Sequence, residues 1–114
     1  MMRLVSVVLV LIFLASGGAK LLQMPFEVQA FARWGYPPWF MLLTGVLEVA
    51  GGLALLIGLR KPGLLRLAAA GLAVLMLGAI TTHLRFAEWP MAAVAIAICA
   101  GCAWVAWRGF RPGR

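Results

Sequence analysis

Long apolar runs separated by short polar connections dominate the chain. Four runs of roughly 20 residues extend over Leu4 to Leu22, Pro38 to Leu59, Leu64 to Leu84 and Trp89 to Trp107. A helix needs about 20 apolar residues to cross the hydrocarbon core of a bilayer. The pattern therefore predicts four membrane-spanning helices joined by short connections, in a single domain over residues 1–114.

The same runs argue against a transmembrane β-barrel. A barrel would show segments of about 10 residues in which apolar and polar positions alternate. Here the runs are continuous and rich in Leu, Ala and Gly. Backbone N–H and C=O groups in lipid must also be bonded within the protein, which a helix achieves by itself. We therefore expect an all-α bundle of four transmembrane helices.

The longest connection, Gln23 to Pro37, predicts a short helix of its own. Pro25 favours the first turn of a helix that runs to about Trp34, and helical spacing gives this segment one apolar and one polar face. Such a helix can lie flat on the outer membrane surface as a lid. Glu27 interrupts the apolar face, so its side chain either turns toward a buried cation or faces solvent. We expect it to face solvent.

Composition supports a lipid environment. Hydrophobic residues make up 65% of the chain, whereas soluble domains are roughly 45–50% apolar. The expected surroundings are therefore a lipid bilayer. The segment Ala15-Ser16-Gly17 loosely resembles a signal-peptide cleavage site, but the apolar run continues to Leu22, so we expect the first run to be retained.

Basic residues are distributed unequally between the two sides that four crossings create. Seven of the ten share the side of the termini: Arg3, Arg60, Lys61, Arg66, Arg108, Arg111 and Arg114. The other three are Lys20, Arg33 and Arg85. Because cytoplasmic ends carry the excess of Lys and Arg, we expect both termini in the cytoplasm and the chain in a cell inner membrane. The net charge of +7 does not indicate nucleic-acid binding, since these residues lie at helix ends and form no basic face.

Glu48 is the clearest polar position inside a predicted span. An ionisable side chain near the bilayer centre costs about 2.5–3.5 kcal/mol on insertion and needs a partner or a purpose. Lys20 and His83 lie toward the outer ends of the first and third runs. A Lys20–Glu48 pair is within reach of the lysine stem, and His83 could join it by a hydrogen bond. The alternatives are that Lys20 extends to the interface, that His83 is interfacial, and that Glu48 is a structural hydrogen-bonding group.

Small residues accompany these polar positions. They are Gly45 and Gly52 on the helix face of Glu48, Gly17 and Gly18 beside Lys20, and Gly71 and Gly78 in the third run. Glycines allow transmembrane helices to pack closely, and around a carboxylate they define a narrow polar pocket. Six candidate ligand-binding residues follow: Lys20, Glu48, His83, Ser16, Thr44 and Thr82.

Cys99 and Cys102 form a C-x-x-C in the last run, a spacing found in dithiol redox pairs. Their neighbours are mostly Ala and Gly, where cysteine serves as a small apolar residue. We therefore favour packing and keep a redox role as a weaker alternative. The sequence contains no metal-ligand cluster and no phosphate-binding loop.

Four short segments, taken together, resemble the DoxX-like family of small four-helix membrane proteins. They are Ser16-Gly17-Gly18-Ala19-Lys20-Leu21, Trp34-Gly35-Tyr36-Pro37, Gly45-Val46-Leu47-Glu48-Val49-Ala50-Gly51-Gly52-Leu53, and Met76-Leu77-Gly78-Ala79 with Thr82-His83. The resemblance spans almost the whole chain and implies a four-helix membrane fold. It also implies an association with quinone-linked oxidation of sulfur compounds or with redox and oxidative-stress complexes, with Lys20, Glu48 and His83 as its polar positions. The cysteine pair is not part of it.

Three functions are compatible with these features. The first is a membrane-embedded subunit that binds a quinone or another small amphipathic molecule, as an accessory subunit of a quinone-linked oxidoreductase with a membrane or redox protein partner. The second is an assembly or scaffold protein for a larger membrane complex. The third is a small transporter, which at 114 residues would require the chain to dimerise, so homo-oligomerisation stays open.

Overall fold

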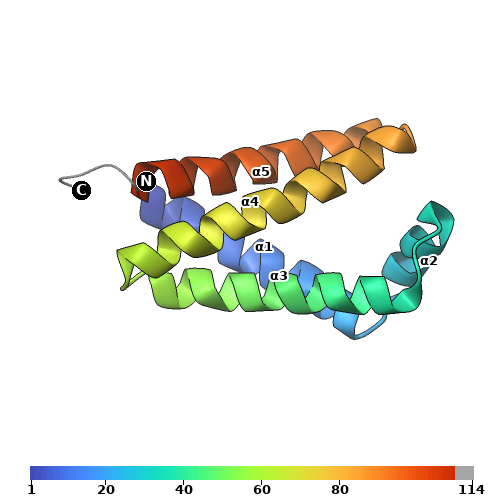
Figure 1. The fold of residues 1–114 in the computed structure, drawn as a ribbon, viewed down its shortest axis with the longest axis horizontal. Helices are drawn as coiled ribbons and strands as arrows, with labels where there is room; N and C mark the ends of the chain where they lie inside the picture. The colour runs from blue at the N-terminus through green and yellow to red at the C-terminus, as the bar shows by residue number, and fades with distance from the viewer. Residues whose placement is uncertain (110–114) are drawn as a thin grey trace.

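Five helices make up the part of the chain that the computed structural model describes, residues 1–109, and this part contains no strand (Figure 1). The helices are α1 Met2–Leu21, α2 Pro25–Trp34, α3 Pro38–Gly58, α4 Pro62–Arg85 and α5 Trp89–Gly109. All except α2 are long and apolar enough to cross a membrane. The predicted all-α bundle of four membrane-spanning helices is confirmed, and the predicted short helix in the first connection is α2.

Prolines determine where most of the helices begin. Pro25, Pro38 and Pro62 are the first residues of α2, α3 and α4, and Pro90 is the second residue of α5. The first-turn N–H groups of a helix have no partner within the helix, so proline is tolerated there and its fixed φ favours the helical turn. The boundaries of the four long helices, predicted from the apolar runs, lie within two residues of those observed.

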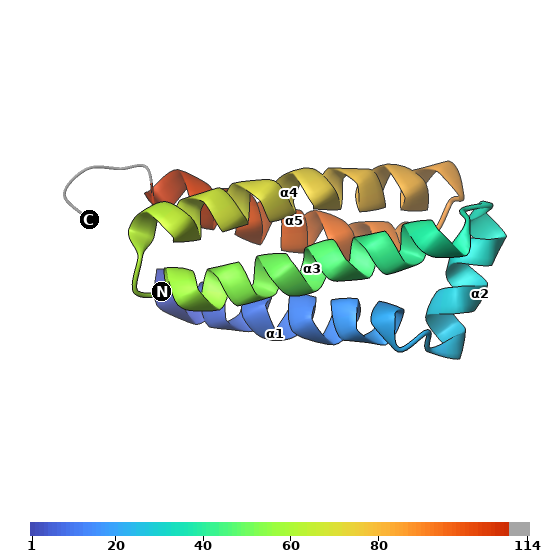
Figure 2. The ribbon, with the colours of Figure 1, turned by 60° about the horizontal axis from the view of Figure 1, so that its bottom comes forward.

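The long helices are arranged as two antiparallel pairs. The α1 helix packs along α3, α4 packs along α5, and the pairs meet mainly through α3 and α4 (Figure 2). The start of α1 and the end of α5 lie at one end of the bundle, whereas α2 crosses the other end (Figure 1). We call these the terminus end and the α2 end. Arg111 and Arg114, which were assigned to the side of the termini, lie outside the described residues.

The closely packed core fills the half of the bundle near the terminus end. Its most deeply buried side chains come from the middle of α1, the second halves of α3 and α5, and the first half of α4: Phe13, Leu55, Ala69, Cys102 and Val105. Side chains from all four long helices interdigitate there. The α2 end lacks this apolar filling, which leaves room for a site.

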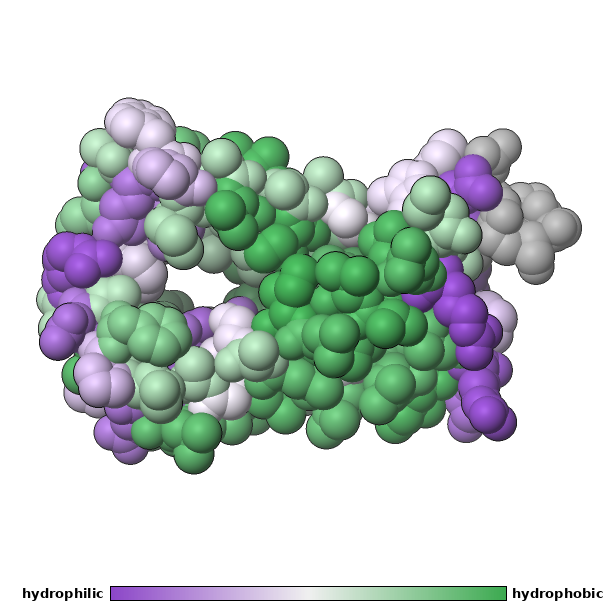
Figure 3. Space-filling model, turned by 180° about the vertical axis from the view of Figure 1, so that it is seen from behind, coloured by the Kyte–Doolittle hydropathy of each residue, from purple (hydrophilic) through white to green (hydrophobic). Residues whose placement is uncertain are grey.

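Apolar side chains also cover the outside of the bundle. Leu67 and Val74 are 71% and 67% exposed, and Figure 3 shows a broad apolar surface between hydrophilic groups at the two ends. Such a large continuous apolar surface is stable only when something other than water covers it. Lipid is the covering that four apolar spans require.

Two glycines allow α1 and α3 to cross closely. A Cβ atom on Gly17 would lie 2.7 Å from Val49 Cγ2 and 2.8 Å from the Gly45 carbonyl oxygen, and one on Gly45 would lie 2.9 Å from Lys20 Cβ. Neither position could carry a larger residue without moving the helices apart. The prediction of close packing holds for these two glycines.

The glycines of α4 behave differently. A Cβ atom on Gly71 or Gly78 would meet nothing within 4 Å. The prediction that they mediate close helix packing is therefore wrong. Spacing of seven residues places two glycines on one helix face, but it does not determine whether another helix covers that face.

Gly17→Ala should destabilise the protein by roughly 1–3 kcal/mol, because the added methyl group would press on backbone atoms of α3. Gly18→Ala is a matched control: its Cβ atom meets nothing within 4 Å, and alanine favours a helix, so stability should be equal or higher. Thermal unfolding of both variants in one detergent would measure the difference. Equal stability of the two variants would contradict the close crossing.

Candidate functional site

A cavity of about 760 Å³ occupies the bundle at the α2 end. The pairs α1/α3 and α4/α5 diverge there (Figure 1), and the opening between them is visible in the space-filling view (Figure 3). Residues from all five helices line the cavity, and most of its wall is apolar. All six candidate ligand-binding residues, Ser16, Lys20, Thr44, Glu48, Thr82 and His83, are among them.

Lys20 and two glutamates form a charged cluster on the α1/α3 side of the cavity. Lys20 Nζ lies 2.9 Å from Glu48 Oε1 and 3.2 Å from Glu27 Oε2. It also donates to Ser16 Oγ at 2.9 Å, and the Ser16 hydroxyl donates to Glu48 at 3.2 Å. We call Ser16, Lys20, Glu27 and Glu48 the inner cluster. A charge this deep is tolerated because each member has a partner.

The close crossing of α1 and α3 creates the inner cluster. Without a Cβ atom at Gly45, the Lys20 stem can lie against α3 and run along it toward Glu48. Lys20 and Glu48 are only 8% and 6% exposed as a result. Lys20 is therefore buried in the bundle and does not extend to the interface. The expected position of Glu27 was wrong, because its carboxylate faces the buried Lys20 and not solvent.

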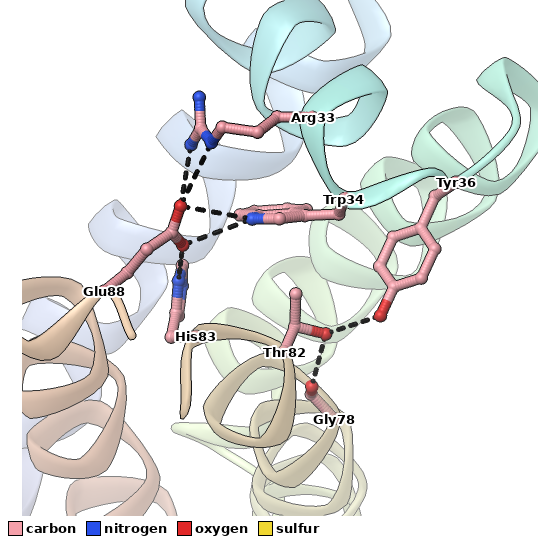
Figure 4. Close-up of polar contacts among 7 residues, drawn as sticks. All are labelled: Arg33, Trp34, Tyr36, Gly78, Thr82, His83 and Glu88. Atoms are coloured by element: carbon pink, nitrogen blue, oxygen red, sulfur yellow. Dashed lines mark hydrogen bonds and ion pairs between the residues drawn. The ribbon is translucent and has the colours of Figure 1, made fainter. Parts of the chain in front are cut away.

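Glu88 organises a second cluster on the α4/α5 side of the cavity (Figure 4). Its carboxylate accepts from Arg33 Nη2 at 2.8 Å and from Trp34 Nε1 at 3.2 Å, both on α2. His83 Nδ1 of α4 lies 2.8 Å from Glu88 Oε1. We call Arg33, Trp34, His83 and Glu88 the outer cluster. It connects α2 to the helix pair on the opposite side of the cavity.

The turn after α4 places Glu88 directly over His83. Ala87 adopts a left-handed conformation at φ 56°, and the Glu88 N–H then bonds back to the His83 carbonyl oxygen at 2.9 Å. This is the common helix-ending motif in which a residue with positive φ turns the chain back on its last turn. Such a φ is costly for a residue with a side chain. As a result, both the backbone N–H and the side-chain carboxylate of Glu88 bond to His83.

Hydrogen bonds from the outer cluster favour the ionised form of Glu88. His83 contributes most, and Arg33 and Trp34 add to it, so the pKa of the Glu88 carboxyl is lowered from its ordinary value. An ionised carboxylate can only accept hydrogen bonds. The His83 Nδ1 atom must therefore be the donor in its 2.8 Å contact.

His83, Thr82 and Thr44 lie on the cavity, but they do not join the inner cluster. His83 pairs with Glu88 and not with Lys20 or Glu48. Thr82 donates to the Gly78 carbonyl oxygen and contacts the Tyr36 hydroxyl at 2.8 Å (Figure 4). Thr44 donates to the Phe40 carbonyl oxygen at 2.8 Å. The sequence placed these residues at the right end of the bundle but not with their actual partners.

Aromatic side chains form the wall between α2 and α3. Phe31 is buried and lies 5.1 Å from Trp34 and 6.0 Å from Tyr36, measured between ring centroids. Tyr36 lies 5.2 Å from Phe40. These tilted and edge-on pairs are the favourable geometries for aromatic rings. They hold α2 against α3 with apolar contacts, whereas α2 reaches the turn between α4 and α5 through its polar contacts with Glu88.

The cysteine pair is separate from the cavity. Cys102 is fully buried in the core, and Cys99 Sγ lies 3.5 Å from the Ala73 carbonyl oxygen. Both are free thiols, and neither lines the cavity. Their surroundings fit the packing role. Within residues 1–109, no group of three or more His, Cys, Asp or Glu side chains could hold a metal ion.

Two of the site glutamates were not recognised from the sequence as site residues. The chain has only three acidic residues, Glu27, Glu48 and Glu88, and all three line this one cavity. Glu27 and Glu88 both lie in connections between predicted spans, where charge is ordinary, so Glu27 was expected to face solvent and Glu88 was not considered. Because the chain has only three acidic residues against ten basic ones, the acidic positions could have been singled out as candidates from the sequence.

Glu88→Gln should loosen the contact between α2 and the α4/α5 pair and lower stability by about 1–2 kcal/mol near neutral pH, because it weakens charge-assisted hydrogen bonds. Because the folded-state pKa of Glu88 is lowered, its stabilising effect is complete above the ordinary value of 4.5 and is lost as pH falls through the folded value below it. Thermal unfolding between neutral and acidic pH would show a steeper acid loss in wild type than in the variant. Parallel pH profiles would assign the loss to other groups.

Comparison with known proteins agrees with the architecture. Residues 4–105 match the sequence model of the DoxX-like family. A protein of Bacillus subtilis (strain 168) named "Uncharacterized protein YdgD" is 37% identical over 101 residues, which cover 84% of this chain and 85% of that relative. No solved structure matches the chain. The match extends over all four membrane-spanning helices and the polar residues of the cavity, and the chain belongs to the DoxX-like family.

Proposed function

We propose that the protein is a membrane-embedded subunit that binds a quinone or another small amphipathic molecule in the cavity at the α2 end. One observation carries the proposal: an otherwise closely packed bundle keeps about 760 Å³ open where its buried charged groups converge. Ligand cavities in proteins typically measure about 300–1,000 Å³ and combine apolar walls with a few polar groups. This cavity has that size and that lining.

The geometry fits a molecule with an aromatic or quinoid head and an apolar tail. Phe31, Tyr36 and Phe40 line the same cavity as the inner cluster and offer flat apolar faces. Aliphatic residues of α4 and α5, such as Leu75 and Val94, extend the apolar lining. A head group near Glu48 and a tail among the aliphatic side chains would match this gradient. Buried ionisable groups within membrane helices commonly mark such sites.

We assign any electron transfer to a redox protein partner. The cysteine pair, which is the dithiol that the sequence offers, lies away from the cavity. In this proposal the chain holds and orients the ligand, and the partner exchanges electrons with it. The family resemblance supports an association with a redox complex.

Purified wild-type protein should carry a lipid-soluble quinone or similar molecule that mass spectrometry detects after solvent extraction. Glu48→Gln should lower the amount per protein about tenfold or more, the effect of losing one hydrogen bond to a charged group. Cys99→Ala is the matched control, because it changes a membrane-embedded residue outside the cavity, and it should leave the amount unchanged.

Two results would count against this function. Absence of any copurifying amphipathic molecule from wild type would remove its main support. Recovery of a stoichiometric membrane partner that is lost in Glu48→Gln, without a bound small molecule, would favour the scaffold function, in which Lys20 and Glu48 only fasten α1 to α3.

We also propose that the protein resides in a cell inner membrane with the terminus end in the cytoplasm. Arg3, Arg60, Lys61 and Arg66 belong to that end, and the excess of Lys and Arg there supports this orientation. A reporter enzyme that is active only outside the cytoplasm should be inactive when fused after Arg114. It should be active when inserted after Gly35, in the turn that follows α2. The reverse pattern would overturn the orientation.

A further inference from the structure

Lys20 has no hydrogen left to donate to a ligand. An ammonium group carries three N–H donors. Three protein acceptors surround Lys20 Nζ: Ser16 Oγ at 2.9 Å, Glu48 Oε1 at 2.9 Å and Glu27 Oε2 at 3.2 Å. All three N–H groups of Lys20, the cation of the inner cluster, are therefore used in hydrogen bonds within the protein.

The hydroxyl donors along the cavity are also occupied. Ser16 donates to Glu48, and Thr44 and Thr82 donate to carbonyl oxygens of their own helices. Because the Thr82 hydrogen is directed to Gly78, Tyr36 must be the donor in the 2.8 Å Tyr36–Thr82 contact. Each of these hydroxyl groups donates its single hydrogen to another group of the protein.

The donors of the outer cluster are directed to Glu88. Trp34 Nε1 and His83 Nδ1 both bond this carboxylate. The Nδ1 hydrogen of His83 and the indole hydrogen of Trp34 are therefore not available to a ligand. Arg33 keeps further N–H groups, but its side chain is 57% exposed at the rim of the cavity.

Acceptors, in contrast, are in excess at the inner cluster. Two carboxylates provide roughly eight lone-pair positions. The protein supplies two N–H bonds from Lys20 and one O–H bond from Ser16 to these carboxylates. One ammonium group and one hydroxyl group therefore face four carboxyl oxygens. The cavity therefore presents acceptors to whatever enters it.

We infer that the polar end of the ligand is a hydrogen-bond donor, with O–H or N–H groups on an apolar body. Within a quinone couple, this is the reduced form: a quinol has two O–H donors, whereas a quinone has only carbonyl acceptors. The inference rests on the proposed function and specifies which ligand the site selects. A protonated amphipathic amine offers the same donor chemistry and is the second source of it.

The selection has a simple physical basis. A carbonyl oxygen brought beside Glu27 and Glu48 would meet only acceptor lone pairs and could form no hydrogen bond with them. An O–H or N–H donor would bond these oxygens in a setting less polar than water, where hydrogen bonds are stronger. Sites built around polar partners reject analogues that cannot complete the bonds.

The test compares the two oxidation states of one probe. Binding of decyl-benzoquinol and decyl-benzoquinone would be measured by calorimetry on the full chain in phosphatidylcholine nanodiscs, anaerobically, with empty nanodiscs subtracted. We expect the quinol to bind at least about tenfold more tightly than the quinone. Equal affinity, or tighter binding of the quinone, would overturn the inference while leaving the proposed function intact. Failure of both probes and of the amine below to bind would contradict the proposed function itself.

Variants of the inner cluster link the preference to the carboxylates. Glu48→Gln supplies an amide that both donates and accepts, so the quinol preference should fall to less than about threefold. Glu27→Gln lies outside the membrane spans and should reduce the preference in the same direction, which keeps the test usable if the first variant fails to fold. Cys99→Ala should keep the full preference. Retention of the full preference in both glutamine variants would contradict the inference.

A pair of amines separates donation from charge. Decylammonium has N–H donors, whereas decyltrimethylammonium carries the same charge without them. We expect decylammonium to bind at least about tenfold more tightly. Equal binding of the two cations would show that negative charge alone selects the ligand, and the donor inference would then be wrong.

Discussion

The ion pair between Lys20 and Glu48 constrains much of this structure. The two side chains are 8% and 6% exposed, and charges buried to that extent are tolerated only with close partners. Their 2.9 Å contact depends on the crossing of α1 and α3, where Gly17 and Gly45 bring the backbones together. The pair thereby fixes the first helix pair at the α2 end. The other pair, α4 and α5, diverges from it there, and the cavity opens between them (Figure 1).

The two ends of the bundle are stabilised by different kinds of contact. Near the termini, apolar side chains such as Phe13, Leu55 and Val105 fill the space between all four long helices. At the α2 end, polar clusters centred on Lys20 and Glu88 connect elements across a partly open space (Figure 4). At the α2 end a ligand can enter a space that is already open, whereas in the core it would have to displace apolar packing. This division lets a small protein keep a rigid fold and an adaptable site.

The charged residues divide into two groups with different tasks. Five of the eight basic residues within residues 1–109 belong to the terminus end: Arg3, Arg60, Lys61, Arg66 and Arg108. All three acidic residues line the cavity, and each is paired with a basic or donor side chain there. The protein thus carries a net charge of +7 and still presents carboxylate acceptors at its site. Net charge therefore says little about the chemistry of the cavity.

The sequence by itself determined the number, the length and the approximate ends of the membrane-spanning helices, because a bilayer demands about 20 apolar residues per crossing and proline marks where a helix can begin. It also placed Lys20, Glu48 and His83 toward one end of the bundle, since depth follows from position along a span. Only the tertiary structure decided the partners. Glu27 turns inward to Lys20, His83 bonds Glu88, and Gly71 faces open space. These outcomes depend on the rotation and crossing of the helices and on the left-handed conformation of Ala87. Helix rotation and crossing are set by packing between segments far apart in the chain, and the periodicity of the sequence does not encode them.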